Sequence, residues 1–492
     1  MNITDVVVIA PFRRPTFRTA ISKVYPVSEP WDSPPLIITG EIHRVGLSVV
    51  YYPLINIMSG FDEDTDHEFL LNLIKDNPAK IYLFSTDYFI PSRSTAAVYG
   101  MKIISKIVKE VHRNSLIGTV GRLSTVLKKR LFGEVPQMDF SVVGEPEETI
   151  SDILNTILDE GMHSAFEKFN SICVRDSDRE PVPCVVNNIE NMALPAYNLL
   201  GPAFELYKSF TGREPKNIPF SMRTSFGCKF KCKFCSGVPN WLNYRKKSAG
   251  KVEREVQFFK EHIGNRGYIC FLEDEIFTRD EEHVIEVSKV FSRNNIFLEG
   301  LYTHSTLLNE RIAVHLQPIT NRVYLGLDNP NDSILRKMSK GQNLDIVLSA
   351  IEIARNANLK VHLEWIIGTP EETVDSLITS LGSIFNFLNT GVVDNINTYV
   401  YCPHPGTEYA ERCAKYNFDI VAGLEDMQES GGYPSVISSH VNREQVFIAY
   451  LMSQLLISEV RESVRLGKFD KEIRNVNKKE LRRIFNLIHY SK

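Results

Sequence analysis

The first 150 residues alternate short apolar runs with segments in which apolar residues recur every three or four positions. Short runs rich in β-branched residues are typical of buried strands, and the longer period is typical of helices with one buried face. The predicted strands are residues 6–10, 48–52, 80–85, 116–119 and 140–143, and the predicted helices are 35–45, 67–76, 95–113 and 123–132. Strands separated by helices in this way predict an α/β fold with a doubly wound parallel sheet.

Small and polar residues follow the predicted strands of this sheet. They are Ser85, Thr86, Gly121, Gly144 and Glu145. In a parallel sheet a ligand lies beyond the carboxyl ends of the strands. Small residues there would allow a large ligand to approach the backbone.

A second α/β series starts at residue 221. Its predicted strands are residues 221–225, 268–272, 297–303, 322–326, 360–367 and 397–401, and its helices include 250–262, 280–292, 345–356 and 373–386. Six βα units with parallel strands predict a partial barrel that is open on one side. The site of such a barrel lies at the carboxyl ends of the strands.

The composition between and after these series suggests the domain limits. Residues 161–220 contain a charged, proline-rich stretch around 176–183 and predict a linker between a first domain, 1–160, and the barrel, 221–415. Residues 416–492 predict a small helical domain. Asn442 and Gln445 have the spacing of a helix N-cap and its capping box, for a helix that ends near Gly467 and is followed by a basic tail.

Charge and hydropathy exclude several classes of protein. The 56 basic and 60 acidic residues nearly balance, which argues against nucleic acid as the main partner. No apolar run approaches the roughly 20 residues of a membrane span, and the N-terminus lacks the basic start of a secretory signal. We therefore expect a soluble, cytoplasmic protein without a membrane partner.

Three of the eight cysteines crowd into one short loop after the first strand of the second series. Cys228, Cys232 and Cys235 are spaced four and three residues apart, so their thiolates can bind three irons of a cubane cluster. A structural zinc site would require a fourth Cys or His at matching spacing, and no convincing one is near. The spacing favours a [4Fe–4S] cluster with one iron left open, and a zinc or purely structural site is the alternative.

This three-cysteine loop resembles the signature of the radical S-adenosylmethionine (SAM) superfamily. The resemblance implies that the open iron chelates the amino and carboxylate groups of SAM. It also implies that an electron from a donor such as flavodoxin or ferredoxin then cleaves SAM to methionine and a 5′-deoxyadenosyl radical. In such systems the cofactor performs the difficult chemistry and the protein positions it.

Four further landmarks match the superfamily in order along the chain. Phe234 stands where the superfamily places an aromatic residue near the adenine, and Asp274 lies in the loop that receives the methionine amino group. Asp328 follows the fourth strand, where the superfamily usually has Glu, and implies a ribose contact. Gly368 and Glu372 resemble the fifth-strand motif that passes the adenine edge.

The first domain resembles the cobalamin-binding domain that precedes the barrel in many radical SAM enzymes. The matching pieces are the loop at Ser85 and Thr86, Gly121, and the stretch from Asp139 through Gly144 and Glu145. The resemblance implies bound cobalamin. The motif that supplies an axial histidine in some cobalamin proteins is absent from the sequence, so the corrin would be held without a histidine ligand.

Three classes of function remain open. The first is cobalamin-dependent methylation of an unactivated carbon in a natural-product or peptide substrate, which uses both domains. The second is radical epimerisation or rearrangement without methyl transfer, in which Cys402, at the end of the sixth strand, donates the hydrogen atom. The third is a non-catalytic iron–sulfur protein for electron transfer or sensing. Trp241, Tyr244, Glu364 and Trp365 are candidates for a substrate pocket or for the core.

Overall fold

The computed structural model describes residues 3–15, 29–88, 91–237, 243–428 and 433–465. The chain forms two compact units. The first consists of Met1–Gly227 and Val238–Glu275, and the second of Cys228–Gly237 and Ile276–Lys492. Each unit is described by itself. Trp241 and the predicted basic tail lie outside the described residues.

A six-stranded sheet forms the centre of the first unit, in the order β2-β1-β3-β4-β5-β6. Its strands are β1 (Thr4–Ile9), β2 (Val49–Tyr52), β3 (Ala79–Ser85), β4 (Leu116–Val120), β5 (Phe140–Val142) and β6 (Ile172–Val174). The pairings among β1 to β5 are parallel, which confirms the predicted parallel sheet. Strand β6 pairs antiparallel with β5 and was not predicted, since its three residues lie in the expected linker.

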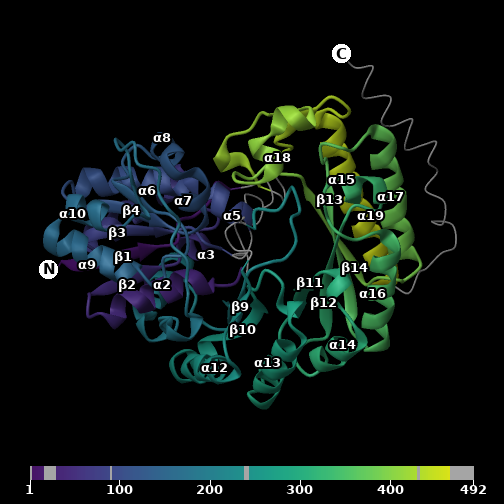
Figure 1. The fold of residues 1–492 in the computed structure, drawn as a ribbon, viewed down its shortest axis with the longest axis horizontal. Helices are drawn as coiled ribbons and strands as arrows, with labels where there is room; N and C mark the ends of the chain where they lie inside the picture. Colours follow the sequence, from purple (N-terminus) through teal and green to yellow (C-terminus); the bar gives the residue numbers. More distant parts are fainter. Residues whose placement is uncertain (1–2, 16–28, 89–90, 238–242, 429–432, 466–492) are drawn as a thin grey trace. The chain divides into compact units, whose positions relative to one another are not determined.

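Helices lie on both sides of this sheet (Figure 1). They include α2 (Ser33–Arg44), α4 (Glu63–Asp76), α6 (Val98–Val111), α7 (Arg122–Leu127) and α9 (Ile150–Glu160). Strand β1 is apolar from Val6 to Ile9 and fully buried there, as expected for a strand that is covered on both faces. In the order 2-1-3-4-5 the strand order reverses between β1 and β3, and ligands of open α/β sheets bind at such a point.

The first βα unit of the second series belongs to the same compact unit. Strand β7 (Ile218–Met222) pairs parallel with β10 (Gly267–Leu272), and α12 (Ala249–Ile263) lies between them in the chain. The backbone of Trp31 pairs with the other edge of β7, and its ring lies 5.4 Å from that of Phe220. Strand β7 starts three residues before the predicted 221–225.

The second unit contains a four-stranded parallel sheet in the order β11-β12-β13-β14. These strands are β11 (Leu301–Thr303), β12 (Arg322–Asp328), β13 (Lys360–Ile367) and β14 (Asn395–Val400). The helices that alternate with them are α13 (Glu281–Arg293), α14 (Glu310–Leu316), α16 (Leu344–Asn356) and α17 (Val374–Asn389). All six predicted strands therefore exist, in two separate sheets.

The C-terminal part of the second unit adds a hairpin and a long helix. Strands β15 (Phe418–Ile420) and β16 (Val436–Ser438) pair antiparallel. Helix α19 (Arg443–Arg465) packs against α17 and β14, beside which it runs in Figure 1. The predicted cap is confirmed, because Asn442 Oδ1 accepts from the Gln445 N–H at 2.8 Å and Gln445 Oε1 accepts from the Asn442 N–H at 3.0 Å. None of the described helices is both long and apolar enough to cross a bilayer.

Candidate functional site

The three cysteines of the predicted cluster loop lie in a partly exposed turn of the second unit. Cys228 and Cys232 are half-buried and Cys235 is exposed. Backbone N–H groups point at two of the sulfurs, from Phe230 to Cys228 Sγ at 3.4 Å and from Gly237 to Cys235 Sγ at 3.3 Å. Hydrogen bonds of this kind to cysteine sulfur tune the potential of an iron–sulfur cluster.

The three thiols are close enough to influence each other electrostatically. Burial raises the pKa of the Cys232 thiol to about 12, against the opposing charge of Lys340, and the thiols of Cys235 and Cys228 raise it further. Bound iron would deprotonate such a thiol outright. Among the described residues, no three His, Cys, Asp or Glu side chains converge on a single ion. A cubane cluster needs a different arrangement, in which each thiolate binds its own iron, and the spacing of the three cysteines in one loop allows it.

The rest of the second unit holds this loop at its backbone. The N–H of Lys233 donates to the carbonyl of Met338 at 3.0 Å, and the carbonyl of Lys233 accepts from Tyr409 at 3.1 Å. The ring of Phe230 stacks on His304 with centroids 3.8 Å apart. The cysteine loop is therefore held by contacts with the segments that follow β11, β12 and β14.

His304 directly follows β11 and was not identified from the sequence. Its Nε2 lies 2.9 Å from the carbonyl of Lys340, which can only accept, so Nε2 carries the proton. Nδ1 then accepts from Thr306. Burial lowers the pKa of His304 to about 3, so the imidazole is neutral at physiological pH.

Asp328, the predicted ribose contact, ends β12 and forms an ion pair that was not expected. Its Oδ2 lies 2.5 Å from Nζ of Lys340, and both side chains are buried. The backbone of Asp328 is left-handed, with φ of 61°, at an irregularity in the β12–β13 register. Asp tolerates this conformation better than most residues, which is a physical reason for Asp at this position.

One cavity of the second unit brings together three of the predicted residues from separate motifs. Phe234, Asp328 and Cys402 line it, together with side chains of β13 and β14 that include Glu364. Cys402 is buried, and its sulfur lies 4.0 Å from Ser435 Oγ. Trp365, the neighbour of Glu364, is fully buried on the opposite face of β13 and belongs to the core.

Gly368 and Glu372 form the turn after β13. The carboxylate of Glu372 accepts from the backbone N–H groups of Gly368 at 2.6 Å and Thr369 at 3.1 Å, and from the Asn329 amide at 2.8 Å. Gly368 has φ of 87°, and a Cβ there would lie 2.5 Å from Val446 of α19. In this structure the two residues join the ends of β12 and β13 to each other and to the C-terminal helix.

Asp274 lies in the first unit, after β10. Its carboxylate accepts from the Thr224 N–H, from Thr224 Oγ1 and from Ser225 Oγ, each at 2.6 Å. The neighbouring Glu275 accepts from the N–H of Gly227, the residue before the cysteine loop, at 3.0 Å. The predicted loop therefore organises the chain immediately ahead of Cys228.

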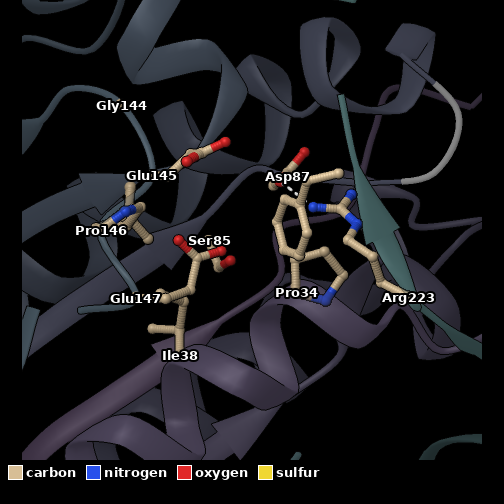
Figure 2. Close-up of a pocket in the computed structure, with 12 residues that line it drawn as sticks. Pro34, Ile38, Ser85, Asp87, Gly144, Glu145, Pro146, Glu147 and Arg223 are labelled. Atoms are coloured by element: carbon tan, nitrogen blue, oxygen red, sulfur yellow. Dashed lines mark hydrogen bonds and ion pairs between the residues drawn. The ribbon is translucent and has the colours of Figure 1, made fainter. Parts of the chain in front are cut away.

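The residues predicted at the end of the N-terminal sheet gather around one pocket of the first unit (Figure 2). Ser85, Gly121, Gly144 and Glu145 line it. Thr86 is buried behind it, where its hydroxyl donates to the carbonyl of Val120 at 2.9 Å. The pocket thus collects the carboxyl ends of β3, β4 and β5, as the strand pattern predicts.

Gly121, Gly144 and Glu145 also have partners within the chain. A Cβ on Gly121 would lie 2.7 Å from the Asp87 backbone nitrogen, and one on Gly144 would lie 2.1 Å from the Cys184 carbonyl oxygen. Glu145 forms a two-pronged ion pair with Arg245, at 2.5 and 2.7 Å. Contacts within the chain are therefore sufficient to account for glycine at 121 and 144 and for glutamate at 145.

Three charged residues of this pocket were not identified from the sequence. Asp87 forms an ion pair with Arg223 at 3.3 Å, drawn in Figure 2, and the buried Glu147 lines the same pocket near Ser85. Burial raises the pKa of Glu147 to about 8, and the charge of Glu145 adds to this shift. Asp87 follows the end of β3 by two residues, a position that could have marked it; Arg223 is 136 residues away, and no sequence pattern links the two.

Comparison with known proteins agrees with this arrangement. Residues 222–383 match the family model of the radical SAM superfamily. An uncharacterized methyltransferase from Pyrococcus horikoshii is 24% identical over 424 residues, which cover 83% of this chain and 86% of that protein.

Two solved structures share the fold over most of the chain. TsrM, a radical SAM methyltransferase from Kitasatospora setae with cobalamin and a [4Fe–4S] cluster bound, superposes with a TM-score of 0.63 at 14% identity, over 93% of this chain and 89% of its own. OxsB, a cobalamin-dependent SAM radical enzyme with cobalamin and SAM bound, superposes with a TM-score of 0.64 at 13% identity. The match covers 92% of this chain and 66% of OxsB. Residues 222–383 therefore match the radical SAM superfamily, and the chain as a whole shares its fold with these two enzymes.

Proposed function

We propose that this radical SAM enzyme methylates an unactivated carbon of a natural-product or peptide substrate, with cobalamin as the methyl carrier. The observation that carries the proposal is the joint occurrence of a parallel sheet of order 2-1-3-4-5 and a radical SAM domain in one chain. Two cobalamin-dependent enzymes share the fold across more than nine-tenths of the chain.

When bound, the cluster and SAM supply a 5′-deoxyadenosyl radical that removes a substrate hydrogen, and cobalamin supplies the methyl group. Cys228, Cys232 and Cys235 would hold three irons of the cluster. Phe234 and Asp328 would flank SAM in the cavity that they share. An external one-electron donor of the flavodoxin or ferredoxin class would reduce the cluster.

The pocket of the first unit offers polar groups for the corrin. Within the part of the chain that the structure describes, Ser85 Oγ and Glu147 Oε2 are buried and have no hydrogen-bond partner. Buried polar groups are normally satisfied, so such orphans indicate a missing ligand or water. With its raised pKa, Glu147 keeps a proton at neutral pH and can donate to a carboxamide oxygen. These two side chains can therefore bind amide groups such as those at the edge of cobalamin.

The first test is metal content and SAM cleavage by the full chain, purified and reconstituted anaerobically with iron, sulfide and hydroxocobalamin. We expect about four irons and one cobalt per chain, and 5′-deoxyadenosine after addition of SAM and dithionite. The triple variant Cys228→Ala/Cys232→Ala/Cys235→Ala should lose the iron–sulfur absorbance and all SAM cleavage. Wild-type protein without that absorbance would refute the proposal.

The methyl-transfer part has its own readout. Cobalamin-loaded protein should form S-adenosylhomocysteine as well as 5′-deoxyadenosine, because one SAM supplies the methyl group and another the radical. Ser85→Ala/Glu147→Leu should reduce cobalt retention while the iron content stays at the wild-type level. Protein that retains iron but neither cobalt nor S-adenosylhomocysteine formation would contradict methylation.

The position of Cys402 supports a second candidate, hydrogen abstraction and return without methyl transfer. Its thiol lines the same cavity as Phe234 and Asp328. In this reaction the adenosyl radical takes a hydrogen atom from substrate carbon, Cys402 returns one, and the resulting thiyl radical must regain an electron and a proton. Product formed in D2O would gain deuterium and no methyl mass. Cys402→Ala should abolish it and Cys413→Ala, a half-buried thiol outside the cavity lining, should not.

A non-catalytic iron–sulfur protein would behave differently from both. It would bind the cluster and form no 5′-deoxyadenosine with SAM and dithionite.

A further inference from the structure

Lys340 is a buried cation of the second unit that belongs to none of the sequence motifs. Only 11% of its side chain is exposed, and its Nζ lies 2.5 Å from Asp328 Oδ2. The same ammonium lies 5.8 Å from the ring centroid of Phe234, which precedes the third cysteine. A buried ammonium is costly unless it is paired, and Asp328 supplies the partner.

The ammonium also lies beside the cysteine loop, because Phe234, whose ring it approaches, stands between Cys232 and Cys235 in the chain. Burial lowers the pKa of Lys340, but the negative charges of Asp328, Cys232 and Cys235 together raise it above its ordinary value. At the Cys232 thiol the influence of Lys340 exceeds that of Asp328.

The backbone around Lys340 fixes the position of this charge. Ser339 and Gly341 on either side are both left-handed, with φ of 57° and 74°. The N–H of Lys340 donates to Leu335 at 3.1 Å, and its carbonyl accepts from His304 at 2.9 Å. A Cβ on Gly326 would lie 2.8 Å from Nζ, so the missing side chain leaves room for the ammonium. The side chain is thus held from several directions.

We propose that Lys340 is a positioning residue of the cluster site, whose fixed positive charge beside Cys232 and Cys235 favours the one-electron-reduced cluster. The inference rests on the proposed function because it requires a cluster on these cysteines. One electron from an external donor converts [4Fe–4S]2+ to [4Fe–4S]+, and no bond is formed or broken. The added negative charge is stabilised by a nearby cation in a partly desolvated site. Net charge near a cluster is one of the factors that set its potential.

The test is a potentiometric titration of the reconstituted full chain, followed by electron paramagnetic resonance of the reduced cluster with no SAM added. Lys340→Met removes the charge at similar volume, Lys340→Arg keeps it, and Lys337→Met removes an exposed charge from the same segment. We expect a lower midpoint potential in Lys340→Met, and potentials close to wild type in the other two. A fully loaded Lys340→Met protein that titrates at the wild-type potential would overturn the proposal.

Lys340→Met leaves Asp328 buried without its partner, which could prevent folding. The double variant Lys340→Met/Asp328→Asn removes both charges, and replacing a whole buried pair is often tolerated. Since Lys340 outweighs Asp328 at Cys232, we expect its potential to fall as well, by less than in the single variant. Loss of the cluster from both variants would also overturn the proposal, because Lys340 would then be needed for structure. Wild-type protein without a cluster would instead contradict the proposed function.

Discussion

Glu372 shows how a residue predicted to contact a cofactor also organises the protein. Its carboxylate accepts three hydrogen bonds, from Gly368, Thr369 and Asn329, at a position with no exposure to solvent. Burial nevertheless outweighs these bonds and raises its pKa from 4.5 to about 7. The turn between β13 and α17 is thus built on a carboxyl group that releases its proton near neutral pH.

This shift predicts a pH dependence of stability. Between pH 4.5 and 7 the folded protein holds a proton at Glu372 that the unfolded chain has released. The contribution of this proton to the free energy of unfolding is therefore fully present below about pH 4.5. It is lost as the pH rises to about 7, and amounts to roughly 3 kcal/mol at most. Glu372→Gln cannot titrate, so its free energy of unfolding, measured by urea denaturation, should fall less over this range than that of the wild type.

The exposed Glu352 supplies the control for this measurement. Glu352→Gln removes a carboxylate from the surface of α16 and should keep the wild-type slope. The buried acids Glu147 and Glu273, both with pKa values raised to about 8, remain in every variant and affect all curves equally. Parallel curves for Glu372→Gln and wild type between pH 4.5 and 7 would contradict the role assigned to this carboxyl group.

At the scale of elements, helix α19 depends on its cap and on one packed face. The Asn442–Gln445 capping box satisfies two N–H groups at its start, and Ser453 bonds Thr398 of β14 at 2.7 Å inside the interface. We expect Asn442→Ala to lower the free energy of unfolding by about 1 kcal/mol, because the first turn loses its acceptor. Urea or thermal denaturation followed by circular dichroism would measure this.

Asn386 in α17 is the matched control for the cap. It is exposed in the last turn of its helix, and Ala has a higher helix propensity than Asn. Asn386→Ala should therefore leave stability unchanged or raise it slightly. An equal loss in both variants would show that the cap contributes nothing beyond the substitution itself.

For the whole molecule, each compact unit has its own buried tryptophan. Trp31 packs against Phe204 and Phe220 in the first unit, and Trp365 of β13 is fully buried in the second. Truncating a buried aromatic residue to Ala typically costs 3–5 kcal/mol, a range that depends on how far the site can collapse. Because local stability is lost in cooperative units, Trp31→Ala should reduce amide hydrogen-exchange protection in β1, β3, β7 and β10.

The reciprocal variant completes this experiment. Trp365→Ala should reduce protection in β12, β13 and β14 and leave β1 and β3 as they are in the wild type. Equal loss of protection across both sets of strands in either variant would show that the chain unfolds as one cooperative body.

The sequence by itself determined the features that depend on local spacing. The alternation of apolar runs predicted eleven of the strands and the parallel pairing of the first sheet, because strand and helix periods are set by neighbouring residues. The three-cysteine loop was recognisable for the same reason, since its thiolates lie within eight positions. The capping box at Asn442 is equally local.

Only the tertiary structure decided which distant side chains meet. The pairs Lys340–Asp328 and Asp87–Arg223, the stack of His304 on Phe230, and the cavity shared by Phe234 and Cys402 join residues from different elements. Strand β6 exists because it pairs with β5, and its three residues carry no pattern of their own. Contacts of this kind depend on the register and packing of strands and loops. A one-residue shift in either would change every partner, so no local pattern in the chain encodes them.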